Sequence, residues 1–307
     1  MFFENTIENS VKVTGIGLHS GTKTTVTLLP APIETGIVFV PDGADSRSGI
    51  RAHVDNLRDT HNAITIGNNG YDIKTIEHFM SAFYALGITN LYVLVEGNEM
   101  PIFDGSSKEI VEAVERAGTK VQNTFFDTFY LPYPVWVEDN GRYLIALPST
   151  SFKITYTIDF SSKSSAIGTQ TAHFTINKDV FKNSIAPART FGFFEDINTM
   201  RGNNLALGGS LENALLYTRE GLVNKTLRFD NECVRHKILD LIGDLSLTGH
   251  RIAAHLIAYK SGHSLDMKLV KKLDMVIKRN RSVRKVPRKI TAKRKIQFER
   301  FKRKMNL

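Results

Sequence analysis

The stretch VRHKILDLIGD, residues 234–244, decides how the second half of this chain folds. Its apolar residues recur at the spacing of an α-helix, but His236, Asp240 and Asp244 also follow one another every four residues. At about 3.6 residues per turn, this spacing places the three polar side chains on one face of the helix. The flanking Ile and Leu residues predict that this face is buried. Because a buried carboxylate is costly unless it is paired or binds a metal, the stretch predicts a functional cluster.

Length and composition are those of a soluble globular protein. Of the 307 residues, 42% are hydrophobic and 23% are charged, and this length suffices for two domains of ordinary size. No run of about 18 apolar residues predicts a membrane-spanning helix, and the opening MFFENTIENS lacks the basic and apolar regions of a signal peptide. The single cysteine, Cys233, leaves no partner for an internal disulfide and fits a reducing compartment. We therefore expect a cytoplasmic protein.

The net charge of +9 comes from the end of the chain. Residues 278–307 contain 14 Lys and Arg but one acidic residue, Glu299, whereas the preceding 277 residues contain 26 basic and 30 acidic residues. The body of the protein thus carries a net charge of −4. A basic block of this kind is typical of a disordered tail, which serves at most to contact polyanions or membrane lipids.

Predicted β-strands and α-helices are interspersed along the chain. Short β-rich runs separated by turn residues dominate the first 70 residues. Helical spacing predicts helices near residues 74–86, 106–117, 231–246 and 262–278. Apolar or alternating runs predict strands near residues 90–97, 133–138, 142–148, 152–160 and 251–259.

The two halves of the chain resemble each other. In each half, a helix with a histidine near its start, His78 or His236, ends in a turn and precedes an apolar strand. This similarity predicts a duplicated α+β layer in which the two helices face one another.

Two of these helices carry residues that suit a metal site. His236 and Asp240 lie one turn apart and can chelate one ion from a rigid helix, while TIEHFMSAF, residues 75–83, places Glu77 beside His78. A catalytic zinc takes three protein ligands and keeps one open position. His78, His236 and Asp240 would supply that set if the helices face each other. A solvated glutamate and a histidine satisfied within the core remain the alternative.

The other cysteine and histidine residues give weaker signals. Cys233 lies one turn before His236, but a buried free cysteine is more often part of the core. His263 lies at the start of the last predicted helix, where the helix dipole disfavours a cation unless a carboxylate counters it. The remaining histidines show no partner spacing and are expected in structural or surface roles: His19, His53, His61, His173, His250 and His255.

Several segments, taken together, resemble one family. The chain is similar to the UDP-3-O-acyl-N-acetylglucosamine deacetylases, zinc-dependent amidases of the committed step of lipid A biosynthesis in Gram-negative bacteria. The similarity runs in order from about residue 1 to residue 277. It rests on VTGIGLHSG (13–21), TIEHFMSAF (75–83), MPIFDGSS (100–107), YTIDF (156–160), AIGTQ (166–170), APARTFGF (186–193), LRFDNECVRHKILDLIGDL (227–245) and SGHSLDMKLVKKL (261–273).

The resemblance assigns roles to individual residues. The zinc ligands it implies are His78, His236 and Asp240. The catalytic residues it implies are a general base, a second catalytic histidine, the carboxylate that orients this histidine and a hydroxyl that holds the oxyanion: Glu77, His263, Asp244 and Thr190. The substrate-binding residues it implies include a lysine for a phosphate and an aromatic ring near the uridine, and they are Lys237, Phe160, Phe191 and Leu18.

The resemblance also implies the architecture. We expect an α+β protein with two layered α/β sandwich domains of similar topology, residues 1–120 and 121–277, followed by the basic tail 278–307. Each domain would carry a small insert. The first, near residues 41–70, would be β-structure, and the second, near residues 192–220, would line a passage for the acyl chain.

The expected reaction is hydrolysis of the N-acetyl amide of UDP-3-O-acyl-N-acetylglucosamine, with one catalytic zinc ion per chain and release of acetate. We expect a monomer that binds no nucleic acid and whose tail contacts anionic lipid of the inner membrane. The alternative is a protein that binds nucleic acid or another polyanion through the basic tail. Such a protein should present basic residues interleaved with aromatic ones across a folded face, and the net charge of −4 in the body argues against it.

Overall fold

The structure, a computed structural model, describes residues 2–41, 49–68 and 70–284, with side chains as far as residue 280. Residues 1–273 form one compact unit, and a second unit begins at Asp274. The described part of the second unit is the continuation of helix α6, which runs from His263 to Arg284. The first unit contains the β-sheets and the candidate site.

A five-stranded sheet forms the framework of the first half. Its strand order is β2-β3-β9-β4-β5, and neighbouring strands are antiparallel except for β4 and β9, which are parallel. The strands are β2 Val11–Ile16, β3 Lys23–Pro30, β4 Ile37–Pro41, β5 Ile50–Arg51 and β9 Leu91–Glu96. The helices of this half are α1 Glu77–Leu86 and α2 Lys108–Ala117. A small sheet precedes α1 and consists of β6 Leu57–Asp59, β7 Thr65–Asn68 and β8 Tyr71–Lys74.

A second sheet forms the framework of the second half. Its main path runs β12-β13-β18-β14-β15, and β11 pairs with β18 beside this path. The strands are β11 Thr128–Tyr130, β12 Val135–Asp139, β13 Arg142–Pro148, β14 Lys153–Asp159, β15 Thr169–Thr175 and β18 Arg251–Tyr259. Residues alternate between buried and partly exposed along β14, so one face of this sheet packs on the core. That face contacts helix α5, Glu232–Ser246, through β14 and β15.

The two sheets share one topology. Along the main path of the second sheet, as in the first sheet, every neighbouring pair is antiparallel except the third and fourth strands, β18 and β14. The additional strand β11 is parallel to β18. In both halves the strand at the centre of the sheet follows a helix, α1 before β9 and α5 before β18. The architecture is therefore α+β with two equivalent layers, as expected. That this equivalence arose by duplication of one ancestral half remains a prediction.

Further elements connect the halves and extend the second one. A two-stranded ribbon pairs β1, Phe2–Ile7, with β10, Thr119–Phe126. A short helix, α3 Lys178–Val180, leads into a π-turn at Phe181–Ile185. The segment expected as the second insert contains β16 Phe191–Phe193, α4 Ile197–Gly202 and β17 Leu215–Tyr217.

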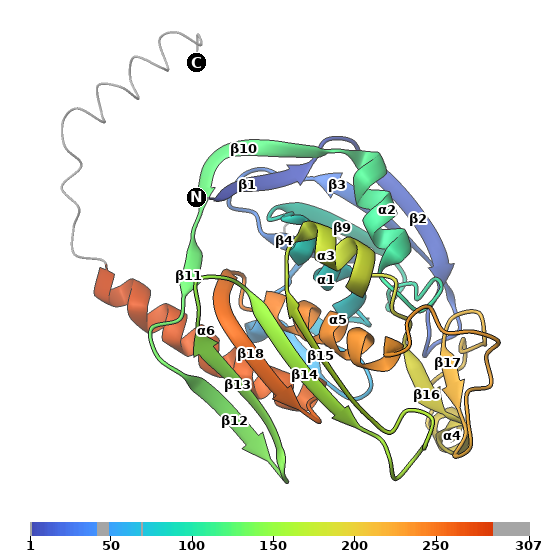
Figure 1. Ribbon diagram of the computed structural model, residues 1–307. Helices are drawn as coiled ribbons and strands as arrows, with labels where there is room; N and C mark the ends of the chain where they lie inside the picture. Colours follow the sequence, from blue (N-terminus) through green and yellow to red (C-terminus); the bar gives the residue numbers. More distant parts are fainter. Residues whose placement is uncertain (1, 42–48, 69, 285–307) are drawn as a thin grey trace, which may run out of the picture. The chain divides into compact units, whose positions relative to one another are not determined.

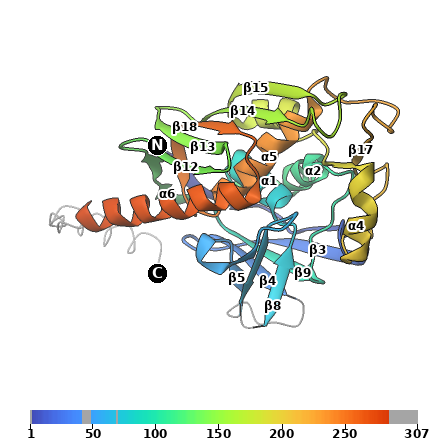
Figure 2. The same ribbon diagram turned by 90° about the horizontal axis from the view of Figure 1, so that it is seen from below.

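Helices α1 and α5 pack directly against each other, and Figures 1 and 2 show them side by side between the two sheets. The sequence permits this contact at one point of α5. A Cβ atom at Gly243 would overlap the backbone carbonyl oxygen of Glu77 in α1. Glycine costs about 1 kcal/mol relative to alanine inside a helix, so its place in α5 is explained by the close approach of the two backbones.

Most predicted elements are present, with shifted boundaries. Gly87, in the left-handed conformation, ends α1 as expected, but this helix begins at Glu77 because residues 71–74 pair with β7 as strand β8. Strands β10 and β15 were not predicted. Residues 285–307 of the basic tail and residues 42–48 of the first insert lie outside the described residues. The described residues of that insert include the short strands β5, β6 and β7. Among the helices of the described chain, none is long and apolar enough to cross a membrane.

The close approach of the helices predicts the effect of a single methyl group. Gly243→Ala should lower the free energy of unfolding by about 1–3 kcal/mol, the usual cost of overpacking a core, although alanine is the better helix former. It should also weaken metal binding, because α1 and α5 carry the candidate ligands. Urea unfolding and metal analysis of the purified variant measure the two effects.

Gly202→Ala is the matched control. Gly202 also lies in a helix, α4, but a Cβ atom there would meet no other atom within 4 Å. This change should leave stability equal or slightly higher. Equal stability of Gly243→Ala and the native protein would contradict the assigned role of Gly243.

Candidate metal centre and active site

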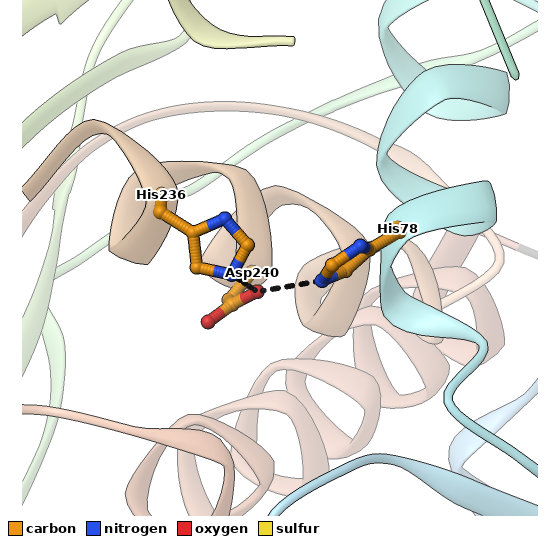
Figure 3. Close-up of side chains that lie close together, drawn as sticks. All are labelled: His78, His236 and Asp240. Carbon is orange, nitrogen blue, oxygen red and sulfur yellow. Dashed lines mark ion pairs between the residues drawn. The ribbon is translucent and has the colours of Figure 1, made fainter. Parts of the chain in front are cut away.

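Three potential metal ligands meet where α1 packs on α5. His78 comes from the first turn of α1, and His236 and Asp240 lie one turn apart on α5. Figure 3 shows both imidazole rings directed at the same carboxylate. Nε2 of His236 is 3.3 Å and Nε2 of His78 is 3.7 Å from Oδ1 of Asp240. Within the described residues, these three form the only group of His, Cys, Asp or Glu side chains arranged to hold a metal ion.

The protonation of the two histidines suits metal binding. The Nδ1–H of His236 donates to the carbonyl oxygen of Ala188 at 3.0 Å, which leaves the lone pair of Nε2 directed at the centre. Burial and the neighbouring His236 lower the pKa of His78 to about 3, and burial also lowers the pKa of His236. Both rings are therefore neutral at physiological pH, which is the form that coordinates a metal.

The carboxylate of Asp240 is ionised although it is buried. Burial opposes the charge, but the neighbouring groups, among them the ammonium group of Lys237, outweigh it and hold the pKa of Asp240 well below its usual range. Its Oδ2 accepts a hydrogen bond of 2.7 Å from Nζ of Lys237, while its Oδ1 has no hydrogen-bond partner within the described structure. An unpartnered buried oxygen between two neutral imidazoles is costly. A bound cation would satisfy it.

The spacing of these atoms fits zinc. Ligand atoms about 2.0–2.1 Å from a tetrahedral zinc ion lie about 3.3 Å from one another. The distances of 3.3 and 3.7 Å to Oδ1 of Asp240 therefore need little adjustment. Two imidazoles and one carboxylate also form the ligand set of several catalytic zinc sites.

A second pair of ionisable groups adjoins the ligands. Glu77 precedes His78 in α1; its Oε2 accepts a hydrogen bond from the backbone N–H of Ile64 at 3.1 Å. Its Oε1 lies 3.8 Å from Nε2 of His263. Burial raises the pKa of Glu77 to about 7. A carboxylate with such a pKa is suited to general base catalysis near neutral pH.

His263 begins helix α6 and is held by a second carboxylate of α5. Its Nδ1 lies 2.8 Å from Oδ2 of Asp244. Burial lowers the pKa of His263, but Asp244 outweighs burial and raises this pKa to about 10. The ring is thus an imidazolium that can donate a proton from Nε2. Asp240 and Asp244, which share one face of α5, serve different partners.

The chain segment that contains Thr190 passes beside the side chain of His236. Ala188 accepts the hydrogen bond from His236, and the ring of Phe191 is 6.4 Å from the ring of His236. Backbone hydrogen bonds fix Thr190 itself, since its N–H donates to Gly105 at 2.7 Å and its carbonyl oxygen accepts from Leu215 at 2.8 Å. The half-buried Thr190 is therefore held on a rigid segment next to the ligands.

The residues expected to bind substrate fall into two groups. Phe160 and Phe191 contact each other at a centroid distance of 5.5 Å, and together with Phe193 they form an aromatic cluster beside His236. The carbonyl oxygen of Leu18 accepts a hydrogen bond from the backbone N–H of Gly208 at 3.0 Å. That contact joins the GIGLHSG segment to the expected acyl-passage insert.

Lys237 differs from the simple phosphate contact that the resemblance implies. Its ammonium group bonds the ligand Asp240, and although burial opposes the charge, Asp240 raises the pKa of Lys237 above its usual value. In the described structure, Lys237 thus fixes the carboxylate of a candidate metal ligand. Whether it also contacts a phosphate stays a prediction.

Cys233 behaves as the sequence predicts, whereas an anchor of helix α1 is not predicted by it. Cys233 is a core residue, as expected: its Sγ contacts the hydroxyl of Tyr217 at 3.5 Å, and burial raises the pKa of this thiol to about 12. The backbone carbonyl of His78 accepts hydrogen bonds from both Ser81 and Ser107, which anchors the first turn of α1. The SS pair of IFDGSS was the available signal for this anchor.

A candidate metal centre beside a paired base and acid is the arrangement of a metal-dependent hydrolase. Sequence comparison narrows this class to one family. The family model for UDP-3-O-acyl N-acetylglycosamine deacetylase matches residues 4–275, and the chain belongs to this family.

Curated relatives agree with the family match. A UDP-3-O-acyl-N-acetylglucosamine deacetylase of Leptospira biflexa is 42% identical over 267 residues, which cover 87% of this chain and 88% of the relative. The proteins of the same name from Syntrophotalea carbinolica and Thermodesulfovibrio yellowstonii are 39% and 41% identical over 89% of this chain, and the alignments cover 88% and 92% of those relatives. The resemblance inferred from the motifs is confirmed.

The pairing of Asp244 with His263 predicts a change in pH dependence. His263 must be protonated to act as an acid, so activity falls as the pH rises through its pKa. Asp244→Asn removes the main charge that raises this pKa. The basic limb of the pH–rate profile should therefore move to lower pH by about one to three pH units, while metal content should not change.

Metal analysis and a pH–rate profile of the same preparation test this assignment. Loss of metal from Asp244→Asn would mean that Asp244 is a ligand. An unchanged basic limb would mean that a group other than His263 titrates there.

Proposed function

We propose that this chain removes the N-acetyl group of UDP-3-O-acyl-N-acetylglucosamine, releasing acetate in the committed step of lipid A biosynthesis. Family membership across residues 4–275 supports the substrate and the reaction. The observation that carries the proposal is the buried group of His78, His236 and Asp240 beside the pair of Glu77 and His263. Amide hydrolysis needs an activated water, a stabilised oxyanion and a proton for the leaving amine, and this arrangement can supply each.

The cofactor in this proposal is one zinc ion, held by Nε2 of both histidines and a carboxylate oxygen of Asp240. Bound zinc polarises a carbonyl group and lowers the pKa of water to about 7. Lys237 and Ala188 support the site from outside, because they fix the orientation of Asp240 and His236.

The protein itself moves the protons in this proposal. Glu77, with its pKa near 7, takes a proton from the attacking water as the new C–O bond forms. The Thr190 hydroxyl donates to the developing oxyanion, an interaction commonly worth about 3–4 kcal/mol per donor. The imidazolium of His263 then gives its Nε2 proton to the amine nitrogen as the C–N bond breaks.

Four residues would place the substrate. The aromatic cluster around Phe160 and Phe191 would stack against the uracil or sugar rings, and Lys237 would attract a phosphate. Leu18, hydrogen-bonded to Gly208, would contact the acyl chain at the start of the passage lined by the insert of residues 192–220.

We further propose a cytoplasmic monomer whose basic tail, residues 278–307, brings it to anionic lipid. The charge of the tail supports this location, since acylated substrates partition to membranes and basic segments bind anionic surfaces. The alternative of a nucleic-acid-binding protein finds no support in the family match, and the body of the protein is mildly acidic.

Removing a ligand tests the metal and the reaction together. Asp240→Ala should lose zinc and reduce acetate release from UDP-3-O-acyl-N-acetylglucosamine by more than about 100-fold, because even the loss of an outer partner of a metal ligand costs about 10- to 100-fold. Zinc content per chain and acetate release are the measurements. Full zinc occupancy with native turnover would contradict this ligand assignment.

Asp139→Ala is the matched control for Asp240→Ala. Asp139 is also a paired carboxylate, bonded to Arg142 and Lys268, but it lies on β12 outside the site. It should keep both zinc and activity. Native protein that binds zinc but releases no acetate from this substrate would overturn the proposed reaction.

Truncation after Arg284 tests the role of the tail while leaving α6 whole. It removes ten basic residues, and because one cationic side chain contributes about 1 kcal/mol near an anionic membrane, binding to anionic vesicles at low salt should fall steeply. Turnover of detergent-solubilised substrate should not change. Equal vesicle binding of the full and truncated chains would remove the membrane proposal.

A further inference from the structure

A buried carboxylate at the start of α5 takes no part in the mechanism above. The side chain of Glu232 has no exposed surface, and both of its oxygens accept hydrogen bonds from residues outside the helix. Its Oε1 accepts from the backbone N–H of Arg189 at 3.0 Å and from Nε of Arg189 at 2.8 Å. Its Oε2 accepts from Nη2 of Arg189 at 3.1 Å and from the backbone N–H of Arg228 at 2.6 Å. A helix N-terminus favours a nearby acid, but it explains neither this burial nor these hydrogen bonds.

The pair of Glu232 and Arg189 lies next to the site at both ends. Glu232 precedes His236 by about one turn of α5. Arg189 lies between Ala188, whose carbonyl oxygen accepts the hydrogen bond from His236, and Thr190, the proposed oxyanion donor. A guanidinium group that bonds a carboxylate through two nitrogens fixes direction as well as distance. The ion pair therefore joins the helix that carries two candidate ligands to the segment that contains Thr190.

Arg228 holds the same segment through a second set of contacts. Its Nη1 donates to the carbonyl oxygen of Pro187 at 2.9 Å, and its Nη2 donates to Oδ2 of Asp104 at 2.8 Å. Asp104 belongs to the first half of the chain, where its neighbour Gly105 accepts the hydrogen bond from the N–H of Thr190. Two carboxylates and two guanidinium groups thus hold this segment, and their formal charges balance.

We propose that Glu232 and Arg189 are positioning residues, whose ion pair holds the hydroxyl of Thr190 at the distance from the metal centre that the oxyanion requires. Neither side chain touches the reacting atoms in this scheme. The role rests on the proposed function, because it acts through the oxyanion donor of that reaction. Loosening the pair should reduce activity while the hydroxyl is present and have little effect once it is gone. A pair needed only for the stability of the fold would reduce activity in both cases.

A double-mutant cycle on kcat tests this dependence. Thr190→Val removes the hydroxyl and keeps the shape of the side chain, and its kcat should fall by about 100-fold or more. Arg189→Lys keeps the charge but cannot form the two-nitrogen contact with Glu232, so its kcat should fall by about tenfold, as a misplaced donor would cause. The variant with both changes should lie within about threefold of Thr190→Val, because residues that act as a unit lose their effects together. Independent effects would multiply to about 1,000-fold, and that result would overturn the proposal.

KM and zinc content of Arg189→Lys separate positioning from other causes. Both should stay within about twofold of the native values, since the oxyanion forms only on the way to the transition state. Loss of zinc would mean that the pair acts on the candidate ligand His236 instead, and would contradict the proposed role. Arg142→Lys is the matched control. Arg142 also bonds a carboxylate, that of Asp139, but it lies on β13 outside the site, and its replacement should leave kcat unchanged.

Hydrogen exchange of the full chain tests, without substrate, whether the pair holds the segment. The N–H of Thr190 should exchange about tenfold faster or more in Arg189→Lys than in the native protein, while the N–H of Ile242 within α5 should not change. Unchanged exchange at Thr190 would overturn the proposal. Should Arg189→Lys fail to fold, Arg189→Gln, whose amide still donates one hydrogen bond, replaces it in both experiments. Faster exchange at Thr190, together with no acetate release by the native protein, would contradict the proposed function and leave intact the role of the pair in holding Thr190.

Discussion

The close contact between α1 and α5 is the constraint on which the site depends. Gly243 lets the backbone of α5 reach the carbonyl of Glu77, and that approach brings His78 within 3.7 Å of Asp240. A bulkier residue would separate the helices by the width of a side chain and with them the ligands. The second sheet packs on α5 through β14 and β15, so it supports the α5 side of this contact. The contact between α1 and α5 therefore determines both the stability of the core and the geometry of the site.

The second requirement is a balance of buried charge. Asp240, Asp244 and Asp266 all lie within the core, and a core of low polarity does not tolerate unpaired carboxylates. Each has a different solution: Asp240 has Lys237 and the candidate metal, Asp244 has His263, and Asp266 has Ser261 and a pKa raised to about 7. In the proposed mechanism, Asp240 is a metal ligand and Asp244 orients the acid, His263. The arrangement keeps imidazolium and neutral imidazole side by side, since His263 is held charged while His78 is held neutral.

Much of the candidate site could be predicted from the sequence, because the spacing of residues along a helix depends only on nearby residues. The four-residue steps from His236 to Asp244 place these residues on one face of α5 whatever the fold, and the family motifs supplied the partner helix. Contacts between distant segments were less accessible. Strand β10 pairs with β1 more than 100 residues away, and no local sequence pattern predicts that pairing. The same holds for Gly243, which is a weak helix former by sequence alone and is explained only by the backbone of α1 packed against it.

The division of the site between halves couples metal binding to folding. One candidate ligand comes from α1 in the first half and two come from α5 in the second, so neither half contains the complete candidate set. A metal that binds the native chain and not the unfolded chain stabilises the native state by mass action, and here the stabilisation falls on the α1–α5 contact. The proposed base, Glu77, and the proposed acid, His263, also come from different halves and lie 3.8 Å apart. The packing of the two halves therefore also sets the geometry of the candidate site. This is why a core position such as Gly243 affects the site as well as the stability of the fold.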